Sequence, residues 1–455
     1  MLFDEATRAG KFAELCEKLT ALMEEHRVPG VAVGLLVDGR EYLRGLGVTS
    51  VENPLPVTEE TLFQIGSVTK TFTATALMRL AEQGRLDLEA PVRRYLPDFQ
   101  VADEATAAAV TVRHLLTHVA GWPGDLFVDT GNGDDAVAKY VAGMAKLEQI
   151  TPLGELWTYN NAAFVVAGRV LEVVAGKSYE AAVKELLLQP LGMSRSFFFP
   201  AEVMIHRFAV GHMLREEGLE IARPWNIPRS SNPAGGLVST VTDLLRYARF
   251  QMGDGRAESG ERLLTPESLR LLQTPVVAAS NGQRMALSWF IEEVGGVRFA
   301  GHGGATFGQM TLFWMAPEQG VALAILTNGQ RGNALNTAAS AWVRKELLGV
   351  AAEQPEPLDL PEAELAPYAG RYEHEGAVIH LEARGNRLIA RVIPKQLEVL
   401  ETKPKEEPPV AAALTGKDRL LILEGPMKGG RGEFLTTSDG RRWLRVGVRA
   451  YELKK

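Results

Sequence analysis

The order of strand-like and helix-like segments is the feature that most constrains how this chain can fold. Residues 31–37 and 41–48 read as two strands joined by an Asp38-Gly39 turn, which is a hairpin signal. Helical patterns dominate residues 68–190, and strands return between 297 and 327 before a helix at about 333–348. Because strands lie at both ends of a helical middle, we predict an α+β fold. Its antiparallel sheet would combine N- and C-terminal strands, with flanking helices and a helical insertion.

The last part of the chain has a different character. The segment Glu353–Pro357 is rich in proline and glutamate, which is typical of a linker. Short strands with repeated turn signals follow, and they predict a small antiparallel all-β barrel. We therefore divide the chain into a domain at 1–352, a linker at 353–360 and a barrel at 361–455.

Composition excludes several classes of function. The chain has 455 residues and a formal charge of −7 spread over both signs, so a basic face for nucleic acid is not expected. It lacks the apolar run of about 18 residues that a membrane-spanning helix needs. The acidic start at Asp4-Glu5 does not fit a secretion signal, so we expect a cytoplasmic location. Cys16 is the one cysteine, and its apolar helical neighbours predict core packing.

The first motif with chemical meaning is Ser67-Val68-Thr69-Lys70. Two residues three positions apart on a helix lie on the same face, so Lys70 can reach Ser67. A desolvated lysine can serve as the base that a serine nucleophile requires. The alternative is that Ser67 caps the helix that follows, as serines often do.

The second motif is Tyr159-Asn160-Asn161, in a loop-like context. A lysine ammonium close to Tyr159 would favour the phenolate and lower the pKa of the hydroxyl, so that Tyr159 could relay protons. Asn161 offers a donor and an acceptor for a substrate amide or for the lysine. An ordinary turn explains these residues equally well.

The third motif is Gly301-His302-Gly303-Gly304-Ala305, which we place directly before a predicted strand. Small residues let a substrate backbone lie close to the protein chain. A backbone N–H here could complete an oxyanion hole with the N–H of Ser67. The alternative is a glycine-rich turn with a solvated histidine.

Together these motifs resemble those of the β-lactamase-related serine hydrolases, which include class C β-lactamases, penicillin-binding DD-peptidases and related esterases. The family pattern is Ser-x-x-Lys, Tyr-x-Asn and Lys-Thr-Gly or His-x-Gly. Residues 111–118, 190–193 and 233–240 also look like segments of this family. The resemblance runs from about residue 14 to 348.

By this resemblance, Ser67 is the acylated nucleophile, Lys70 its general base and Tyr159 a proton shuttle. Asn161 would position Lys70 and the substrate, and Ala305 is the candidate for the second oxyanion N–H. His302, Gly303 and Gly304 take the place of the Lys-Thr-Gly motif, and together with Asn161 they are expected to bind substrate.

Histidine in the third motif is a departure that bears on the substrate. Its reference pKa near 6.5 leaves it largely neutral at pH 7, so it holds a carboxylate less well than lysine does. Members with His-x-Gly include peptidases directed at D-amino acids and esterases. We therefore expect a peptidase acting on small peptide substrates, with a preference for D-residues. A carboxylesterase, a weak β-lactamase and a penicillin-binding acyl sensor without turnover remain alternatives.

Neither a metal nor a cofactor is needed for this chemistry. His114 and His118 have the i, i+4 spacing of helical metal ligands, but the glutamate of a His-Glu-x-x-His site is missing. The segment 365–372 resembles the start of a lipocalin-like barrel. Such a barrel could cover the active-site mouth, form a subunit interface in a homo-oligomer or bind an apolar ligand, and we favour the first two roles.

Overall fold

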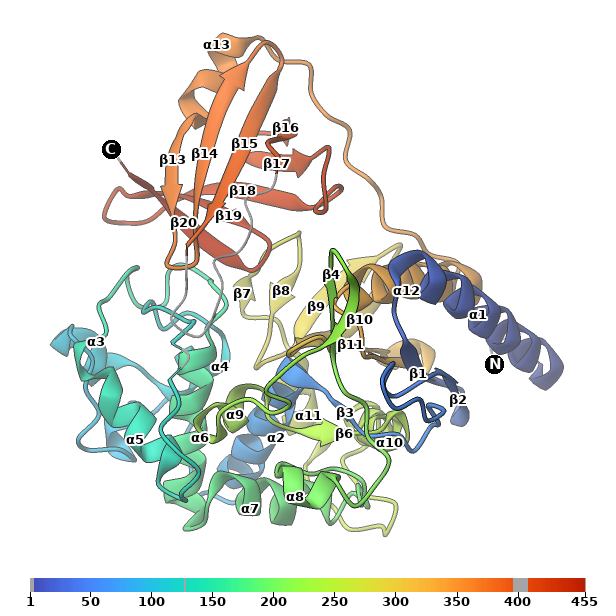
Figure 1. The fold of residues 1–455 in the computed structure, drawn as a ribbon. Helices are drawn as coiled ribbons and strands as arrows, with labels where there is room; N and C mark the ends of the chain where they lie inside the picture. The colour runs from blue at the N-terminus through green and yellow to red at the C-terminus, as the bar shows by residue number, and fades with distance from the viewer. Residues whose placement is uncertain (1–3, 127, 396–407, 455) are drawn as a thin grey trace.

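The computed structural model describes residues 4–126, 128–395 and 408–454. Its main sheet is antiparallel and has 8 strands in the order β2-β1-β12-β11-β10-β9-β8-β7 (Figure 1). The N-terminal strand β1 pairs with β12, so that Val31 lies opposite Thr327. This pairing confirms the predicted sheet. The strands are β1 (Gly30–Val37), β2 (Arg40–Gly47), β7 (Val277–Ala278), β8 (Arg284–Met285), β9 (Phe290–Val294), β10 (Val297–Ala305), β11 (Met310–Ala316) and β12 (Val321–Thr327).

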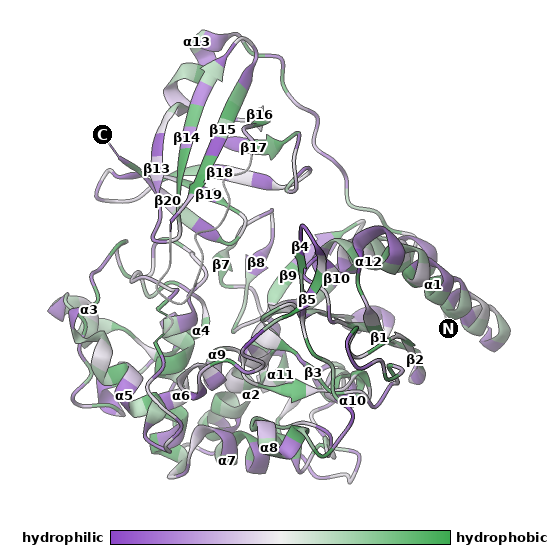
Figure 2. Ribbon diagram, viewed as in Figure 1, coloured by the Kyte–Doolittle hydropathy of each residue, from purple (hydrophilic) through white to green (hydrophobic). Residues whose placement is uncertain are grey.

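The two faces of this sheet are buried against different helices. Val31, Val33 and Leu35 of β1 belong to a core that includes side chains of α1 (Glu5–His26) and α12 (Gly332–Leu348). The alternate residues Ala32 and Leu36 belong to the core on the opposite face, beneath α10 (Val241–Met252). Successive strand residues point to opposite faces, which is why β1 is apolar throughout and lies inside the molecule (Figure 2). Cys16 packs with the α1 side chains, as predicted.

Helix α2 (Thr69–Glu82) lies at the centre of the helical region. Its residues Thr69–Met78 and Leu80 are buried, and α2 packs against α6 and α9. A helix enclosed on all sides holds its first turn rigidly. The surrounding elements are β3 (Phe63–Gln64), α3 (Glu104–Ala109), α4 (Val112–Leu116), α5 (Ala136–Gly143), α6 (Asn161–Ala175), α7 (Tyr179–Val183), α8 (Pro200–Val203), the hairpin of β4 (His212–Arg215) and β5 (Gly218–Ile221), α9 (Asn232–Gly235), β6 (Val238–Ser239) and α11 (Pro266–Gln273).

The C-terminal part forms a closed barrel of β13 to β20 in sequential order, which confirms the predicted barrel. Strand β13 closes it by pairing with β20, and side chains such as Tyr372, Phe434 and Leu444 fill its interior. The strands are β13 (Gly370–Glu373), β14 (Ala377–Arg384), β15 (Arg387–Pro394), β16 (Val410–Gly416), β17 (Arg419–Ile422), β18 (Arg431–Thr436), β19 (Arg442–Val446) and β20 (Arg449–Lys454), preceded by α13 (Glu362–Leu365). Residues 349–361 form neither helix nor strand, and the domain boundaries within them stay a prediction.

The barrel is docked onto the main body through the β19–β20 hairpin. Arg445 is 3% exposed and donates hydrogen bonds to the carbonyls of Trp157, Ala278 and Ala279. The backbone N–H of Tyr159 donates to the carbonyl of Val448 at 2.9 Å. The barrel therefore touches the segment that carries the second motif, above the helical region (Figure 1).

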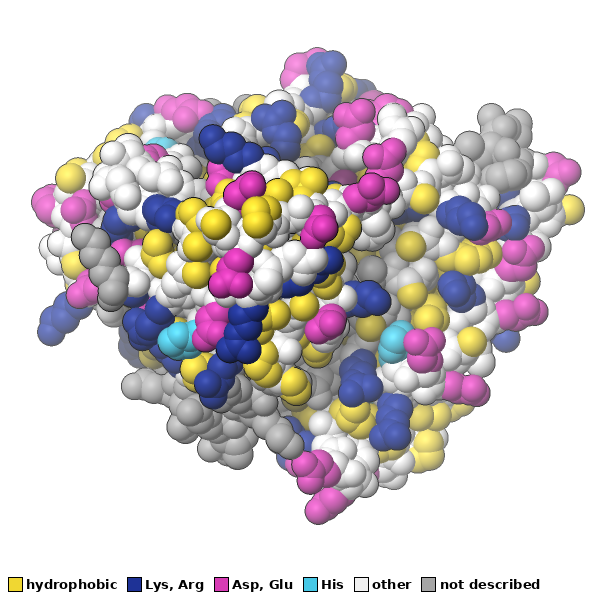
Figure 3. All heavy atoms as spheres, turned by 90° about the horizontal axis from the view of Figure 1, so that it is seen from above, with side chains coloured by type: hydrophobic (Ala, Val, Ile, Leu, Met, Phe, Trp, Pro, Cys, Tyr) yellow, Lys and Arg dark blue, Asp and Glu magenta, His cyan; other side chains and the backbone are white. Residues whose placement is uncertain are grey.

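Charged side chains of both signs are interspersed where the molecule is seen from the barrel side (Figure 3). Within the described residues, no helix has the length and apolar character required to cross a bilayer.

Candidate active site

Ser67 and Lys70 lie on one turn at the start of α2. Ser67 belongs to a 3₁₀ turn, Gly66–Val68, that leads into the helix. The Lys70 Nζ lies 3.0 Å from the Ser67 Oγ. The helix N-cap is Val68 and no side chain caps it, so the capping alternative for Ser67 is wrong.

Lys70 is buried and has three polar contacts, and both features bear on its protonation state. Its side chain is fully buried, and Nζ donates to Asn161 Oδ1 at 2.8 Å and to the Ala234 carbonyl at 2.6 Å. A neutral amine has two hydrogens and one lone pair, and two carbonyl oxygens take up both hydrogens. In the neutral amine the lone pair is then left for the Ser67 hydroxyl, whereas an ammonium donates its third hydrogen to the Ser67 Oγ. Burial lowers the pKa of Lys70 well below its ordinary value, the Arg449 charge lowers it further, and Asp125 opposes the shift.

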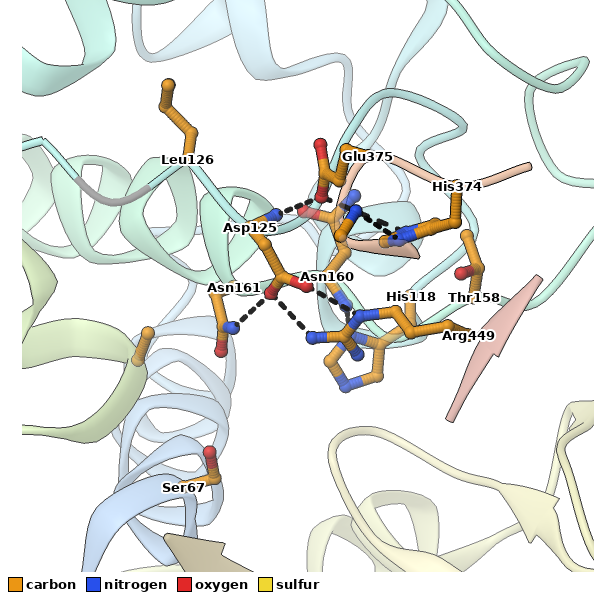
Figure 4. Close-up of polar contacts among 12 residues, drawn as sticks. Ser67, His118, Asp125, Leu126, Thr158, Asn160, Asn161, His374, Glu375 and Arg449 are labelled. Carbon is orange, nitrogen blue, oxygen red and sulfur yellow. Dashed lines mark hydrogen bonds and ion pairs between the residues drawn. The ribbon is translucent and has the colours of Figure 1, made fainter. Parts of the chain in front are cut away.

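A polar chain links Lys70 to the barrel. Asn161 Nδ2 donates to Asp125 Oδ1 at 2.9 Å, which fixes the amide with its oxygen toward Lys70. Arg449 of β20 binds the same carboxylate through Nε at 2.7 Å and Nη2 at 2.5 Å (Figure 4). Its Nη1 is buried and has no hydrogen bond to any residue that the structure describes. Asp125 and Arg449 were not predicted from the sequence, because both lie outside the three motifs.

Tyr159 lies beside the lysine, immediately before α6. The Lys70 Nζ is 4.9 Å from the centre of its ring, and the Arg449 guanidinium is 5.1 Å from it. The predicted lowering of the Tyr159 pKa is wrong. Burial raises the pKa of this hydroxyl, and the Ser67 hydroxyl and the Arg449 charge offset the rise only in part. Desolvation of the phenolate outweighs the nearby cation, so Tyr159 is a neutral phenol at pH 7.

His118 supports Tyr159 from the other side. Its ring stacks on the Tyr159 ring with 4.4 Å between centroids, and its Nδ1 accepts from the backbone N–H of Asn160 at 2.9 Å. Burial keeps the pKa of His118 well below its ordinary value, so the ring is neutral. His114 instead accepts from the backbone N–H of Thr111 at the start of α4. The two histidines thus make separate packing and capping contacts.

Asp125, His374 and Glu375 form the one group of potential metal ligands in the described part of the chain, with ligand atoms within 4.8 Å of one another. Arg449 binds both oxygens of Asp125, and Glu375 Oε1 accepts from the Asp125 backbone N–H at 2.8 Å. These contacts fasten the barrel to the loop before α5 (Figure 4).

The third motif forms the end of strand β10 rather than a loop before a strand, which corrects the prediction. Strand alternation buries His302 and Gly304 and leaves Gly303 and Ala305 exposed. A Cβ at Gly304 would lie 1.9 Å from the Ile65 carbonyl oxygen and 3.2 Å from the Ser67 nitrogen. Pairing with β11 along one edge holds this glycine-rich run in an extended conformation.

Gly66 brings Ala305 next to the nucleophile. Its φ of +51° is a conformation that glycine adopts without strain, and a Cβ here would lie 2.6 Å from the Ala305 nitrogen. The backbone of β10 therefore contacts the turn that carries Ser67. This proximity supports the prediction that the N–H groups of Ser67 and Ala305 form an oxyanion hole.

His302 is uncharged in this site. Its Nδ1 donates to the Gly303 carbonyl at 2.6 Å, and its Nε2 is buried without a partner among the described residues. Burial, aided by the Lys70 charge, lowers the pKa of His302 to about 3. The ring is therefore neutral at pH 7, as expected.

Gly304 and Gly303 provide a matched test of this geometry. Gly304→Ala is expected to push β10 away from Ile65 and Ser67 and to lower kcat/KM by about 10²-fold, which is the effect of losing an oxyanion donor. Gly303→Ala should keep the fold, because its Cβ meets nothing closer than the Thr311 carbonyl at 3.6 Å. Ester hydrolysis and thermal unfolding of both variants provide the measurement. Wild-type activity in Gly304→Ala would contradict this placement of β10.

Comparison with known proteins shows the family to which this chain belongs. Residues 16–347 match the model of the "Beta-lactamase" family. Penicillin-binding protein 4 of Amycolatopsis lactamdurans is 36% identical over 375 residues, which cover 79% of this chain and 97% of that protein.

Two solved structures share nearly the whole architecture. The structure of SurE with D-Leu has a TM-score of 0.76 and 25% identity, covering 98% of this chain and 100% of SurE. The octameric penicillin-binding protein homologue from Pyrococcus abyssi has a TM-score of 0.67 and 25% identity, covering 97% of this chain and 100% of that one. From its fold, its motifs and these relatives, the chain belongs to the β-lactamase family of penicillin-binding-protein-like serine hydrolases.

Proposed function

We propose that this protein is a serine peptidase that works through an acyl-enzyme on Ser67 and prefers substrates with D-residues. The observation that carries the proposal is the buried Lys70 amine, 3.0 Å from the Ser67 Oγ, with its two other contacts made to carbonyl oxygens. Burial lowers the pKa of Lys70 well below its ordinary value, which favours the neutral amine that can take the serine proton.

The reaction follows from these contacts. Lys70 accepts the Ser67 proton while Oγ attacks the substrate carbonyl, and the N–H groups of Ser67 and Ala305 stabilise the oxyanion. The neutral Tyr159 hydroxyl then donates a proton to the leaving nitrogen and recovers one from Lys70. Water, activated by the same groups, hydrolyses the acyl-enzyme and restores the Ser67 hydroxyl.

Two observations support a peptide substrate over a penicillin. The neutral His302 supplies no charge to hold a β-lactam carboxylate. The relative SurE has been seen with D-Leu, which supports the preference for D-residues.

Arg449 and Asp125 are expected to move the pH dependence of acylation in opposite directions. Acylation needs neutral Lys70, so its rate rises as pH increases through the pKa of Lys70. Arg449 lowers this pKa and Asp125 raises it. Arg449→Met should therefore move the acidic limb of kcat/KM to higher pH, and Asp125→Asn should move it to lower pH. The measurement is kcat/KM for an activated ester against pH, and shifts of the same sign would contradict the roles given to these charges.

The substrate class is tested with matched pairs of L- and D-dipeptides, a p-nitrophenyl ester and a chromogenic cephalosporin. We expect repeated turnover of D-peptides and slow cephalosporin cleavage. Ester turnover with no peptide cleavage would make the protein a carboxylesterase, and one stoichiometric burst without turnover would make it an acyl sensor. Either result contradicts the proposal.

We also propose that the protein self-associates, since the homologue from Pyrococcus abyssi is octameric. Light scattering of the purified full chain measures this, and a monomer at all concentrations would refute it.

A further inference from the structure

A second cavity lies beside the catalytic groups without including them. Its volume is about 350 Å³, which is within the range of small-molecule sites. Its walls come from β3, from the start of α8, and from residues 225–238, which include α9 and the start of β6 (Figure 1). Ser67, Lys70 and Tyr159 are absent from its lining, so the mechanism above leaves the cavity unused.

The walls of this cavity are mainly aromatic and aliphatic. Phe198 and Val238 are buried at its base, and Phe199, Trp225 and Ile227 are half-buried along its sides. Such walls favour a flat apolar group, because aromatic rings contribute a large contact area and defined packing geometry. The apolar walls of the cavity therefore favour an aromatic or bulky aliphatic ligand.

Gln64 supplies one polar group to the cavity. Its side chain is 5% exposed, its Nε2 donates to the Trp225 carbonyl, and its backbone N–H donates to Gln309 Oε1. The Gln64 Oε1 is buried and has no hydrogen bond to any described residue. A buried acceptor without a partner is costly, so a ligand that donates a hydrogen bond here would be favoured.

The charge of Arg229 on the wall is already balanced. Its guanidinium bonds to Glu180 at 3.1 Å and to Asp134 at 2.6 Å, and it lies 5.0 Å over the ring of Phe199. An anionic ligand would have to compete with these carboxylates. The cavity therefore favours a neutral group.

One chain segment separates this cavity from the catalytic lysine. Gly235 and Gly236 line the cavity, and the preceding Ala234 carbonyl accepts from Lys70 Nζ. A Cβ at Gly235 would lie 3.6 Å from the carbonyl carbon of Gly66, the residue before the nucleophile. An occupant of the cavity thus contacts the segment that holds Lys70.

We propose that this cavity binds a neutral aromatic group that carries one hydrogen-bond donor, of the size of a phenol or an indole. The donor bonds to Gln64 Oε1, and the ring packs between Phe199 and Trp225. The aromatic group has two possible sources. One is a tyrosine or tryptophan side chain of a substrate that acylates Ser67, and this source rests on the proposed function. The other is a free small molecule. Both sources use the same chemistry.

The binding test uses the full-length protein and the matched pair indole and benzofuran. The two molecules have nearly the same shape, but benzofuran has an oxygen in place of the indole N–H. Calorimetric titration is expected to show saturable indole binding about tenfold tighter than benzofuran binding, which is the difference that one neutral hydrogen bond makes. No saturable indole binding, or equal affinity for both, would overturn the proposal.

Two variants test whether indole binds in this cavity. Ala201 is exposed at the rim of the cavity, so Ala201→Trp is expected to fill the opening and abolish indole binding, while Ala201→Ser keeps it. Gln64→Met keeps the size of the side chain and should remove the preference for indole over benzofuran. Circular dichroism and thermal unfolding check that each variant is folded. Undiminished indole binding in folded Ala201→Trp would locate the binding elsewhere and refute the assignment.

A kinetic comparison separates the two sources. If the group belongs to the substrate, esters of N-acetyltyrosine react faster than those of N-acetylalanine, and Ala201→Trp erases the difference. If the ligand is free, added indole changes the rate of p-nitrophenyl acetate hydrolysis in wild-type protein but not in Ala201→Trp. Calorimetry needs no turnover, so binding without any hydrolysis would refute the proposed function and leave the cavity assignment standing.

Discussion

Replacing Ser67 by alanine is expected to lower kcat/KM for activated esters and peptides by at least about 10⁴-fold, because the residual rate of a serine hydrolase without its nucleophile comes from binding and the oxyanion hole alone. The substitution removes one oxygen, which lies 3.0 Å from Lys70 Nζ and also interacts with the Tyr159 hydroxyl. We expect the fold to be kept, since the helix cap does not depend on this side chain. Steady-state ester hydrolysis is the measurement.

A suitable control is Ser178→Ala, which removes a serine hydroxyl from the start of another helix. The Ser178 hydroxyl accepts from the Ala181 N–H at the start of α7, so its loss affects capping and not acylation. Ser178→Ala should cost about 1 kcal/mol in the free energy of unfolding and keep its activity. If Ser67→Ala hydrolysed esters at the wild-type rate, the nucleophile would be another residue.

Lys70→Met is expected to slow acylation by about 10³-fold, within the range that a positioned general base contributes. Methionine fills most of the volume that lysine occupies, and it places no charge in a fully buried site. The Ala234 carbonyl and Asn161 Oδ1 lose a donor, so a modest loss of stability accompanies the loss of rate. Pre-steady-state kinetics with a chromogenic ester measure the acylation step directly.

Lys184→Met is the matched control, because Lys184 is exposed and pairs with Glu202 at the surface. Lys184→Met should acylate at the wild-type rate and stay folded, since an exposed ion pair contributes little to the free energy of unfolding. A full-amplitude burst at the wild-type rate constant in Lys70→Met would rule out Lys70 as the base.

The main sheet and the barrel could be predicted from sequence because their signals are local. The Asp38-Gly39 turn between two apolar runs fixes the first hairpin, and alternating patterns with regular turns mark the barrel strands. The glycine-rich motif at 301–305 was predicted to lie directly before a strand, whereas it forms the end of β10. Glycine has low strand propensity, so the local sequence gives little signal for a strand here. Close packing of Gly304 against Ile65 explains why glycine is needed in a strand.

The candidate catalytic residues Ser67, Lys70, Tyr159 and Asn161 lie together as their motifs predicted, and the His302 ring lies beside the Tyr159 ring. The supporting residues could not be predicted in the same way. Arg449 and Asp125 are 324 positions apart in sequence and meet through the docking of the barrel, which no local pattern encodes. The pKa of Tyr159 was predicted in the wrong direction for a related reason, since burial is a property of the assembled fold.

The central claim is that Ser67 Oγ takes up the substrate acyl group while Lys70 accepts the Ser67 proton. The most direct measurement is acid quenching of the enzyme during turnover of an activated ester, followed by peptide mapping of the covalent adduct by mass spectrometry. We predict one acyl group per chain, located on Ser67, that forms far more slowly in Lys70→Met. An adduct on a different residue, or hydrolysis without any covalent adduct in repeated quenches, would contradict the account.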